Sequence, residues 1–333
     1  MTHDLFLAAR RKLLLTAAAS FGLMAALPLR ARTRPALQTL QILRIGFQKS
    51  AVNLVILKQQ GALEKRFPGA RVQWVEFPAG PQLLEALSVG SLEFGLTGDS
   101  PPVFAQAAGK DLLYVGAEPS KPLSSAVLVQ ENSPLRTLAD LKGKRVALQK
   151  GSSAHYLLVR AVEKGGLQWG DITPIYLAPA DARAAFEKGA VDAWAIWDPF
   201  YAATELAIKP RVLTTGKGLS GNNSFYLASN PFVEQHPQAV QALLEELTRA
   251  DAYVQSNRKE AAQLIADFSG LSLATVHLFI SRRPASPVGL LTPTIVADQQ
   301  RVADSFLKLE LIPRRVEVAQ IVWHPARIGV ASR

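Results

Sequence analysis

The sequence of 333 residues contains no cysteine, which excludes disulfide bonds, thiolate metal sites and a cysteine nucleophile. Histidine is scarce, and His155, His236, His277 and His324 show no metal-ligand spacing. The chain also lacks a G-x-S-x-G elbow, a Walker G-x-x-x-x-G-K-[S/T] motif and a G-x-G-x-x-G turn after a strand. We therefore find no catalytic constellation and expect neither a metal site nor a cofactor.

Dense basic runs are missing as well, although the formal net charge is +10. The Lys and Arg residues are scattered, and no module of interleaved basic and aromatic residues is present, so nucleic acid is not an expected partner. A positive surface of this kind favours the approach of a small anion.

Residues 1–31 have the pattern of an export signal peptide. Arg10-Arg11-Lys12 precedes an apolar stretch, 13–29, that is too short for a comfortable membrane span, and Leu29-Arg30-Ala31 is a possible cleavage site. The basic residues fit the general export route and the twin-arginine route equally well. No cysteine follows that could carry a lipid anchor, so we predict a soluble exported protein in a compartment enclosed by an outer membrane.

Strand-like and helix-like patterns alternate after residue 40, which indicates an α/β fold with helices flanking mostly parallel sheets. A first group of expected strands covers 43–47, 71–77, 92–96 and 112–116. The second lobe is expected to begin with a strand at 125–130 and to end with a strand at 225–228. The chain beyond is mostly helical, at 237–255, 259–268, 273–280 and 294–308.

The two groups of strands repeat one plan. Arg44-Ile45-Gly46-Phe47-Gln48-Lys49 matches Arg145-Val146-Ala147-Leu148-Gln149-Lys150, and Gly90, Glu93 and Asp99 correspond to Gly189, Asp192 and Asp198. Two matches in the same order favour an internal repeat over coincidence between two α/β units.

Four polar strand ends are the candidate binding site, because ligands of open α/β sheets bind beyond the carboxyl ends of the strands. They are Gln48-Lys49-Ser50, Gly98-Asp99-Ser100, Gln149-Lys150-Gly151-Ser152-Ser153 and Trp197-Asp198-Pro199. The second and third ends each precede a helix, so each is either an ordinary N-cap or an anion site.

The strand at 192–197 alternates its faces, so Trp194 is expected in the core and Trp197 at the rim of the cleft. Asp198 is expected to cap the helix at Pro199, with contact to a cationic part of a ligand as the alternative.

Five stretches resemble the periplasmic aliphatic-sulfonate-binding family of ABC importers. They are LRIGFQKS (43–50), VEFPAGPQLLEALSVGSLEFGLTGDSPPVFAQAAG (75–109), DLKGKRVALQKGSSAHYLL (140–158), PADARAAFEKGAVDAWAIWDPF (179–200) and ADSFLKLELIPRRV (303–316). The similarity covers nearly the whole chain after the signal peptide.

The resemblance implies a two-lobed, type II periplasmic-binding-protein fold that closes over its ligand in the cleft. Lobe one then comprises 40–123 and 232–333, and lobe two comprises 124–231. The stretch 282–287 departs from the family pattern, so the resemblance leaves its part in the pocket open. The resemblance implies that the sulfonate binds among Gly98, Asp99, Ser100, Gly151, Ser152 and Ser153. It also implies that Gln48 and Trp197 line the cleft.

The expected function is reversible capture of an alkanesulfonate, without chemistry, for delivery to an ABC permease and its ATPase, which dock on both lobes of a monomer. Neutral amides and hydroxyls are expected to suffice, without a buried arginine. Taurine and nitrate binders share the fold and are alternatives, as is an enzyme acting on a small organic anion. The absence of cysteine argues against the pyrimidine-making enzymes that resemble this family.

Overall fold

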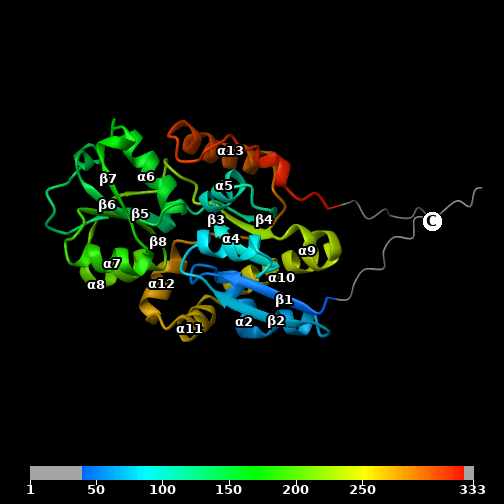
Figure 1. Ribbon diagram of the computed structural model, residues 1–333. Coiled ribbons are helices and arrows are strands. Elements are labelled where there is room, and N and C mark those ends of the chain that lie inside the picture. The colour runs from blue at the N-terminus through cyan, green and yellow to red at the C-terminus, as the bar shows by residue number, and fades with distance from the viewer. Residues whose placement is uncertain (1–39, 326–333) are drawn as a thin grey trace, which may run out of the picture. The chain divides into compact units, whose positions relative to one another are not determined.

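The structure, a computed structural model, describes residues 40–325, so the predicted signal peptide lies outside the described residues. Within this range two five-stranded sheets are each flanked by helices (Figure 1). We call each sheet with the helices packed on it a lobe. The expected two-lobed α/β fold is confirmed.

The first sheet has the strand order β2-β1-β3-β10-β4. Strands β1, β2 and β3 pair in parallel, whereas β10 runs antiparallel to both of its neighbours. The bounds are β1 Ile42–Phe47, β2 Arg71–Glu76, β3 Phe94–Gly98, β4 Leu113–Glu118 and β10 Ser224–Ala228.

The second sheet has the strand order β7-β6-β8-β5-β9, again with one antiparallel strand, β5, next to the last position. The bounds are β5 Ser125–Val129, β6 Arg145–Leu148, β7 Thr173–Tyr176, β8 Ala193–Trp197 and β9 Arg211–Thr215. Both sheets are therefore mostly parallel and share one topology.

The matched residues of the repeat occupy equivalent places in the two sheets. The amide of Arg44 in β1 donates to Glu93 Oε2 at 2.6 Å, and the amide of Arg145 in β6 donates to Asp192 Oδ2 at 2.8 Å. In each lobe the arginine side chain also pairs with the same carboxylate. The predicted internal repeat is confirmed at the level of these contacts.

The expected end of the second lobe is wrong. The strand predicted at 225–228 is β10, which pairs with β3 and β4 in the middle of the first sheet. The second sheet ends with β9 at Thr215, so the lobe boundary lies between 216 and 223 rather than at 231. The pattern of buried residues reveals a strand, but it does not say which sheet the strand joins.

Helices cover both faces of the first sheet, and β10 contributes to both layers. Phe225 and Leu227 pack with α4, α5 and α13, whereas Tyr226 and Ala228 pack with α2, α10 and α11. This alternation is that of a central strand. The bounds are α2 Val52–Gln60, α3 Ala62–Arg66, α4 Gly80–Ser88, α5 Ser100–Ala107, α9 Asn230–Gln235, α10 Pro237–Ser256, α11 Arg258–Ser269, α12 Leu273–Ser281 and α13 Pro293–Lys308.

The second lobe has its own core around the fully buried Trp194, whose ring centroid lies 5.8 Å from that of Phe186. Its helices are α6 Ser153–Lys164, α7 Pro179–Glu187 and α8 Phe200–Ile208. Short 3₁₀ turns complete the fold at Pro122–Ser124, Leu138–Leu141, Trp169–Asp171 and Val318–Ile321.

Two segments, 119–124 and 216–223, connect the lobes and run beside each other. The amide of Lys121 donates to the Gly221 carbonyl at 2.8 Å, and Asn222 Nδ2 donates to the Lys121 carbonyl at 3.3 Å. We call these two segments the crossovers. A pair of adjacent connections of this kind acts as the hinge of a two-lobed fold.

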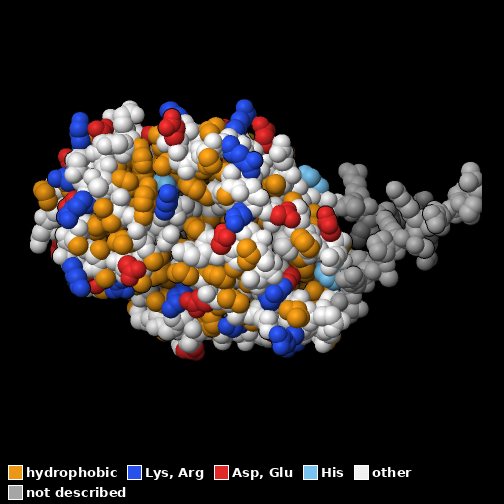
Figure 2. Space-filling model, in the orientation of Figure 1, with side chains coloured by type: hydrophobic (Ala, Val, Ile, Leu, Met, Phe, Trp, Pro, Cys, Tyr) orange, Lys and Arg blue, Asp and Glu red, His pale blue; other side chains and the backbone are white. Residues whose placement is uncertain are grey.

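The surface mixes charges of both signs: Figure 2 shows acidic and basic side chains interspersed on the face that it presents. No helix within residues 40–325 combines the length and the apolar character needed to cross a bilayer.

Candidate functional site

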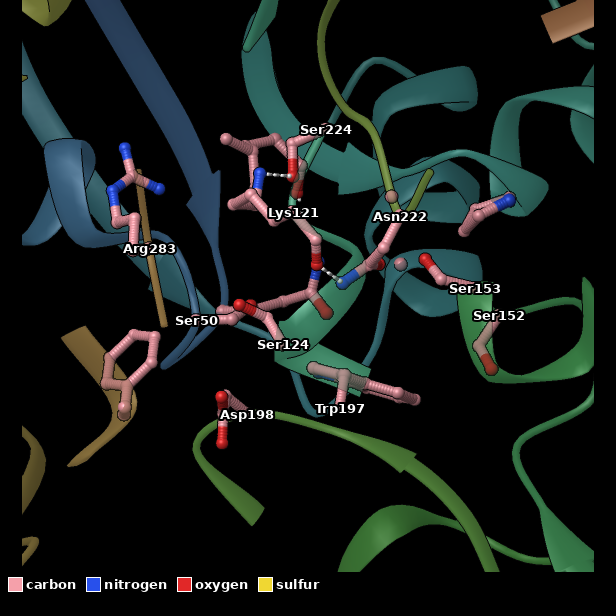
Figure 3. Close-up of a pocket in the computed structure, with 16 residues that line it drawn as sticks. Ser50, Lys121, Ser124, Ser152, Ser153, Trp197, Asp198, Asn222, Ser224 and Arg283 are labelled. Carbon is pink, nitrogen blue, oxygen red and sulfur yellow. Dashed lines mark hydrogen bonds between the residues drawn. The ribbon is translucent and has the colours of Figure 1, made fainter. Parts of the chain in front are cut away.

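A pocket lies between the lobes, where strand ends of both sheets meet the crossovers (Figure 3). This is the position at which open α/β sheets bind ligands. The residues that line it are Gln48, Ser50, Gly80, Leu96, Gly98, Pro101, Lys121, Ser124, Ser152, Ser153, Trp197, Asp198, Asn222, Ser224, Phe279 and Arg283.

Six of the nine residues predicted to bind the ligand line this pocket: Gln48, Gly98, Ser152, Ser153, Trp197 and Asp198. The other three, Asp99, Ser100 and Gly151, are buried behind its wall. Sequence reasoning therefore reached all four strand ends but did not separate the residues at the pocket surface from those that support it.

Ser100 is turned away from the pocket. Its hydroxyl donates to Asp99 Oδ1 at 2.9 Å, and both residues are buried. Pro101 and Pro102 follow and have no N–H, so the start of α5 offers few amides to a ligand. Burial raises the pKa of Asp99 to about 6, against the hydrogen bonds from Ser100 and Ser153.

The start of α6 presents donors more directly. Gly151 adopts a positive φ of 71° that brings the chain into the turn, and Ser152 Oγ donates to the Gln149 carbonyl at 2.8 Å. The amides of Ser153 and Ala154 lie in the first turn, where α-helix geometry provides no acceptor. This helix terminus is therefore the better candidate for an anion site.

The lobes are in close contact at this helix start. A Cβ added at Gly98 of the first lobe would lie 1.8 Å from Ser153 Oγ and 3.2 Å from Ser153 Cβ of the second lobe. A side chain here would require the Ser153 hydroxyl to rotate away and the two lobes to move apart slightly, so this close approach is that of closed lobes.

The two tryptophans of β8 divide as the alternation of the strand predicts. Trp194 is fully buried in the core, whereas Trp197 is 9% exposed and lines the pocket. Asp198 caps α8, because its Oδ1 accepts a hydrogen bond from the Ala202 amide at 3.0 Å. Burial raises the pKa of Asp198 to about 7, while the nearby Arg282 opposes this rise.

A buried cluster of four charges below the pocket was not predicted. Glu118 lies at its centre, 3.0 Å from Lys121 Nζ and 3.0 Å from Arg283 Nη1. Asp251 completes the cluster with an oxygen 3.7 Å from Arg283. The pocket therefore does not consist of neutral donors alone as expected, since Arg283 is buried and lines it.

Neutral donors also hold Glu118. The Tyr226 hydroxyl donates to its Oε1 at 2.8 Å, and Asn53 Nδ2 donates to the same oxygen at 3.2 Å. Burial alone would raise the pKa of Glu118, but Arg283 and Lys121 lower it to about 2. The carboxylate is thus ionised and holds both cations in place.

The polar pocket residues that were not predicted come from the crossovers, from the start of β10 and from the residues after α12. Lys121, Ser124, Asn222 and Ser224 lie in or beside the crossovers. Figure 3 shows Lys121 and Asn222 between Arg283 on one side and Ser153 on the other. A hinge between two lobes forms the floor of their cleft, so the segments that join two predicted lobes are where such residues can be sought.

His155 on α6 is buried where the two lobes touch. Its ring lies among Phe104 and Phe306 of the first lobe and Trp169 and Tyr176 of the second. Its Nδ1 accepts from the Gly151 amide at 3.2 Å, and its Nε2 has no partner among the described residues. Burial, helped by Lys150, lowers its pKa to about 3.

Within residues 40–325, no group of three or more His, Asp or Glu side chains is arranged to hold a metal ion. The polar groups at the pocket are donors or ion-paired side chains. Such an arrangement suits the binding of an anion.

Comparisons with known proteins agree with this geometry. The family described as NMT1/THI5 like matches residues 69–261. A protein of Escherichia coli (strain K12), named as an aliphatic sulfonates-binding protein, is 48% identical over 288 residues, which cover 86% of this chain and 90% of that protein.

Solved structures share the fold. The alkanesulfonate-binding protein SsuA from Xanthomonas axonopodis pv. citri, bound to MOPS, has a TM-score of 0.83 and 49% identity, and the match covers 86% of this chain and 99% of that chain. The desulfurization enzyme DSZB, at 17% identity and a TM-score of 0.61, covers 85% of this chain and 96% of its own. The second likeness concerns the fold alone.

The central position of Glu118 leads to a first prediction. Replacing Glu118 by Ala leaves Arg283 and Lys121 buried without their carboxylate, so the free energy of unfolding should fall by about 3 to 5 kcal/mol. Urea denaturation measures this change. Glu317→Ala, which breaks a pair 3.4 Å long with the exposed Arg315, should cost less than about 1 kcal/mol. Equal losses in both variants would contradict the assigned role of Glu118.

His155 leads to a second prediction. Its pKa is lower in the folded chain than in the unfolded chain, so protonation below pH 6.5 favours unfolding, by up to about 1.4 kcal/mol per pH unit until pH 3. His155→Asn keeps an acceptor for the Gly151 amide but does not titrate. Between pH 7 and pH 5 the wild type should lose about 2 kcal/mol more than this variant.

Asp99 and Asp198 have raised pKa values and contribute with the opposite sign in this range, but they are present in both proteins. The difference between the two urea titrations therefore isolates His155. Parallel loss of stability in wild type and variant would show that His155 titrates normally in the folded state.

Proposed function

This chain belongs to the NMT1/THI5-like family, and from that premise we propose that it captures aliphatic sulfonates in the periplasm and delivers them to an ABC importer. The observation that carries the proposal is the closed pocket, where hydroxyl and amide donors at the start of α6 share a lining with two buried cations. The named relatives support the choice of sulfonate over other anions.

The head group matches the donors of both lobes. A sulfonate keeps its negative charge across physiological pH and accepts hydrogen bonds on three oxygens, so several donors must converge on it when it is buried. We assign this role to the amides of Ser153 and Ala154 at the start of α6 on one side and to Lys121 on the other. Lys121 Nζ already donates to Glu118 at 3.0 Å and to Ser224 Oγ at 2.8 Å.

The charge balance of the pocket favours a monoanion. Two buried acids, Glu118 and Asp251, offset two buried bases, Lys121 and Arg283. A bound sulfonate adds one negative charge to a neutral cluster, whereas sulfate adds two. Since an uncompensated buried charge is costly, the site should select sulfonates over sulfate.

Apolar side chains accommodate the organic tail. Trp197, Phe279, Leu96 and Pro101 line the same pocket. An indole ring offers both an apolar face and an N–H, which suits a ligand with a hydrocarbon tail beside a polar head. Taurine and nitrate remain alternative ligands, and nitrate would leave these walls unused.

We propose binding without catalysis. The pocket lining offers hydrogen-bond donors and charges that are already paired, and the two relatives named above with nearly half of their residues identical are both binding proteins. The enzyme DSZB has the same fold, so the alternative is an enzyme acting on a small organic anion. Recovery of the ligand unchanged after long incubation would argue against that alternative.

Location and partners follow from the same proposal. The basic and apolar pattern of residues 1–31 supports export, by the general or the twin-arginine route, to the periplasm. There the closed monomer would dock with both lobes on a permease, whose ATPase drives import. No nucleic-acid partner is proposed.

Calorimetry with ethanesulfonate, taurine, MOPS, sulfate and nitrate tests the ligand class. We expect binding of the alkanesulfonates and MOPS, with sulfate weaker because it adds a second buried charge. Failure to bind any sulfonate would overturn the proposal, and tight binding of nitrate alone would replace it with the alternative.

The contact between Gly98 and Ser153 gives a mutational prediction. Gly98→Ala places a Cβ 1.8 Å from Ser153 Oγ and 3.2 Å from Ser153 Cβ, so closure then requires the Ser153 hydroxyl to leave its place and the lobes to move apart slightly, and affinity for MOPS should fall about tenfold. Calorimetry measures the change. Gly170→Ala is the matched control, because a Cβ there meets nothing within 4 Å.

Combining Gly98→Ala with Ser153→Gly removes both atoms that the new methyl group meets. The double variant should close again but lack the Ser153 hydroxyl. An affinity of Gly98→Ala equal to that of Gly170→Ala would mean that the bound state does not require this closure.

A further inference from the structure

Arg282 joins the two lobes without lining the pocket. It is the first residue after α12, whose Val276, Phe279 and Ile280 pack into the core of the first lobe. Its guanidinium nevertheless lies on the second lobe, 3.1 Å from Asp198 Oδ1. In Figure 1, α12 lies between the first lobe and α8 of the second.

The guanidinium of Arg282 contacts three side chains of the second lobe. Besides Asp198, it pairs with Glu205 on α8, and its central carbon lies 3.8 Å from the centroid of the Tyr201 ring. Two carboxylates and an aromatic face thus surround one cation. The planar guanidinium can satisfy all three at once, which a lysine cannot.

The neighbouring arginine has a different task. Arg283 points into its own lobe, where it pairs with Glu118 on β4 and with Asp251 on α10. Of these two consecutive arginines, Arg283 therefore forms part of the floor of the pocket, and Arg282 forms the bridge to the other lobe. The pairs of Arg282 are the ones that separation of the lobes would break.

The bridge reaches the wall of the pocket. Asp198 directly follows Trp197, and its carboxylate also caps α8 through the Ala202 amide. Whatever holds Asp198 against the first lobe also holds Trp197 over the ligand site. Arg282 is thus placed to act on the ligand through the lobe and not by contact.

Burial makes this ion pair more than a surface contact. The side chains of Arg282 and Asp198 are only 13% and 1% exposed. Breaking a partly buried, hydrogen-bonded charge pair acts mainly on the rate of dissociation, whereas exposed pairs contribute little. When the lobes separate, Asp198 loses its cation.

We propose that Arg282 is a latch between the lobes, a positioning residue that bridges to Asp198, Glu205 and Tyr201 and thereby sets how long the closed lobes retain a bound sulfonate. This inference rests on the proposed function, because it presumes a ligand held between the lobes. The latch stabilises the closed state and leaves the open state almost unchanged. It should therefore slow ligand release without speeding ligand capture.

Stopped-flow measurement of MOPS binding, followed by the intrinsic tryptophan fluorescence to which Trp197 at the pocket contributes, tests the latch. Arg282→Gln should raise the dissociation rate about tenfold and change the association rate less than about threefold. Arg301→Gln is the matched control, since Arg301 pairs with Asp298 one turn away on the same exposed helix. A dissociation rate in Arg282→Gln equal to that in Arg301→Gln would overturn the proposal.

Two further variants separate the latch from a general loss of structure. Arg282→Lys keeps the charge but loses the planar contact with Tyr201, and Glu205→Gln weakens the bridge while leaving every pocket residue intact. Both variants should raise the dissociation rate by smaller factors than Arg282→Gln does. The salt dependence of that rate should be weaker in Arg282→Gln than in the wild type, and an unchanged dependence would count against the latch.

A readout without ligand distinguishes failure of the latch from failure of the proposed function. Since the chain contains no cysteine, Ser91→Cys and Lys142→Cys place one dye on an exposed site of each lobe for energy transfer. Arg282→Gln should shift the population toward longer distances. If the wild type binds no sulfonate but the distances shift, the function is wrong and the latch stands; if sulfonate binds and neither distance nor dissociation rate changes, only the latch is wrong.

Discussion

The ionised carboxylate of Glu118 is the group on which the rest of the site depends. It closes β4 at the point where the chain leaves the first lobe, and it holds Lys121 of one crossover and Arg283 beyond α12. Its register partner Ser224 opens β10, where the chain returns. One buried acid thus joins the outgoing strand, the returning strand and the C-terminal helices, and it converts a hinge into the floor of a binding pocket. The cost of burying four charges is offset only because each has a partner.

Two consecutive arginines show how neighbouring residues act on different scales. Arg283 completes a cluster that is internal to one lobe, and Arg282 reaches the other lobe. The first contributes to the shape and charge of the pocket, and the second contributes only when the lobes are together. Affinity in such a protein combines both: the contacts that the ligand makes, and the contacts that the lobes make with each other when the ligand is present.

Much of the fold and part of the site could be predicted from the sequence. The internal repeat is visible in the sequence because each lobe has the same ion pair, between an arginine of one strand and the acid that precedes the neighbouring strand. These pairs are Arg44 with Glu93 and Arg145 with Asp192. Trp197 and Trp194 were separated correctly because strand alternation is a local property. The prediction that Ser100 contacts the ligand was not met in the same way, because its hydroxyl donates to the adjacent Asp99. A serine that begins a helix has the same sequence pattern whichever way its side chain points. Asp198, which pairs with Arg282, and Glu118, which pairs with Arg283, lie 84 and 165 residues away from them, so no local pattern could reveal these pairs.

The place of β10 in the first sheet has a consequence for how the chain acquires its structure. This strand lies between β3 and β4, yet it is made only after all five strands of the second sheet. The second lobe is continuous in sequence, so during synthesis it can complete its sheet once the chain has reached Thr215. At that point the sheet of the first lobe still lacks β10 between β3 and β4. The second lobe, which is inserted in the sequence of the first, can therefore fold before the first lobe does. The first sheet is completed when β10 pairs with β3 and β4. This order keeps the first lobe, and with it the candidate binding site, unfinished until most of the sequence is present.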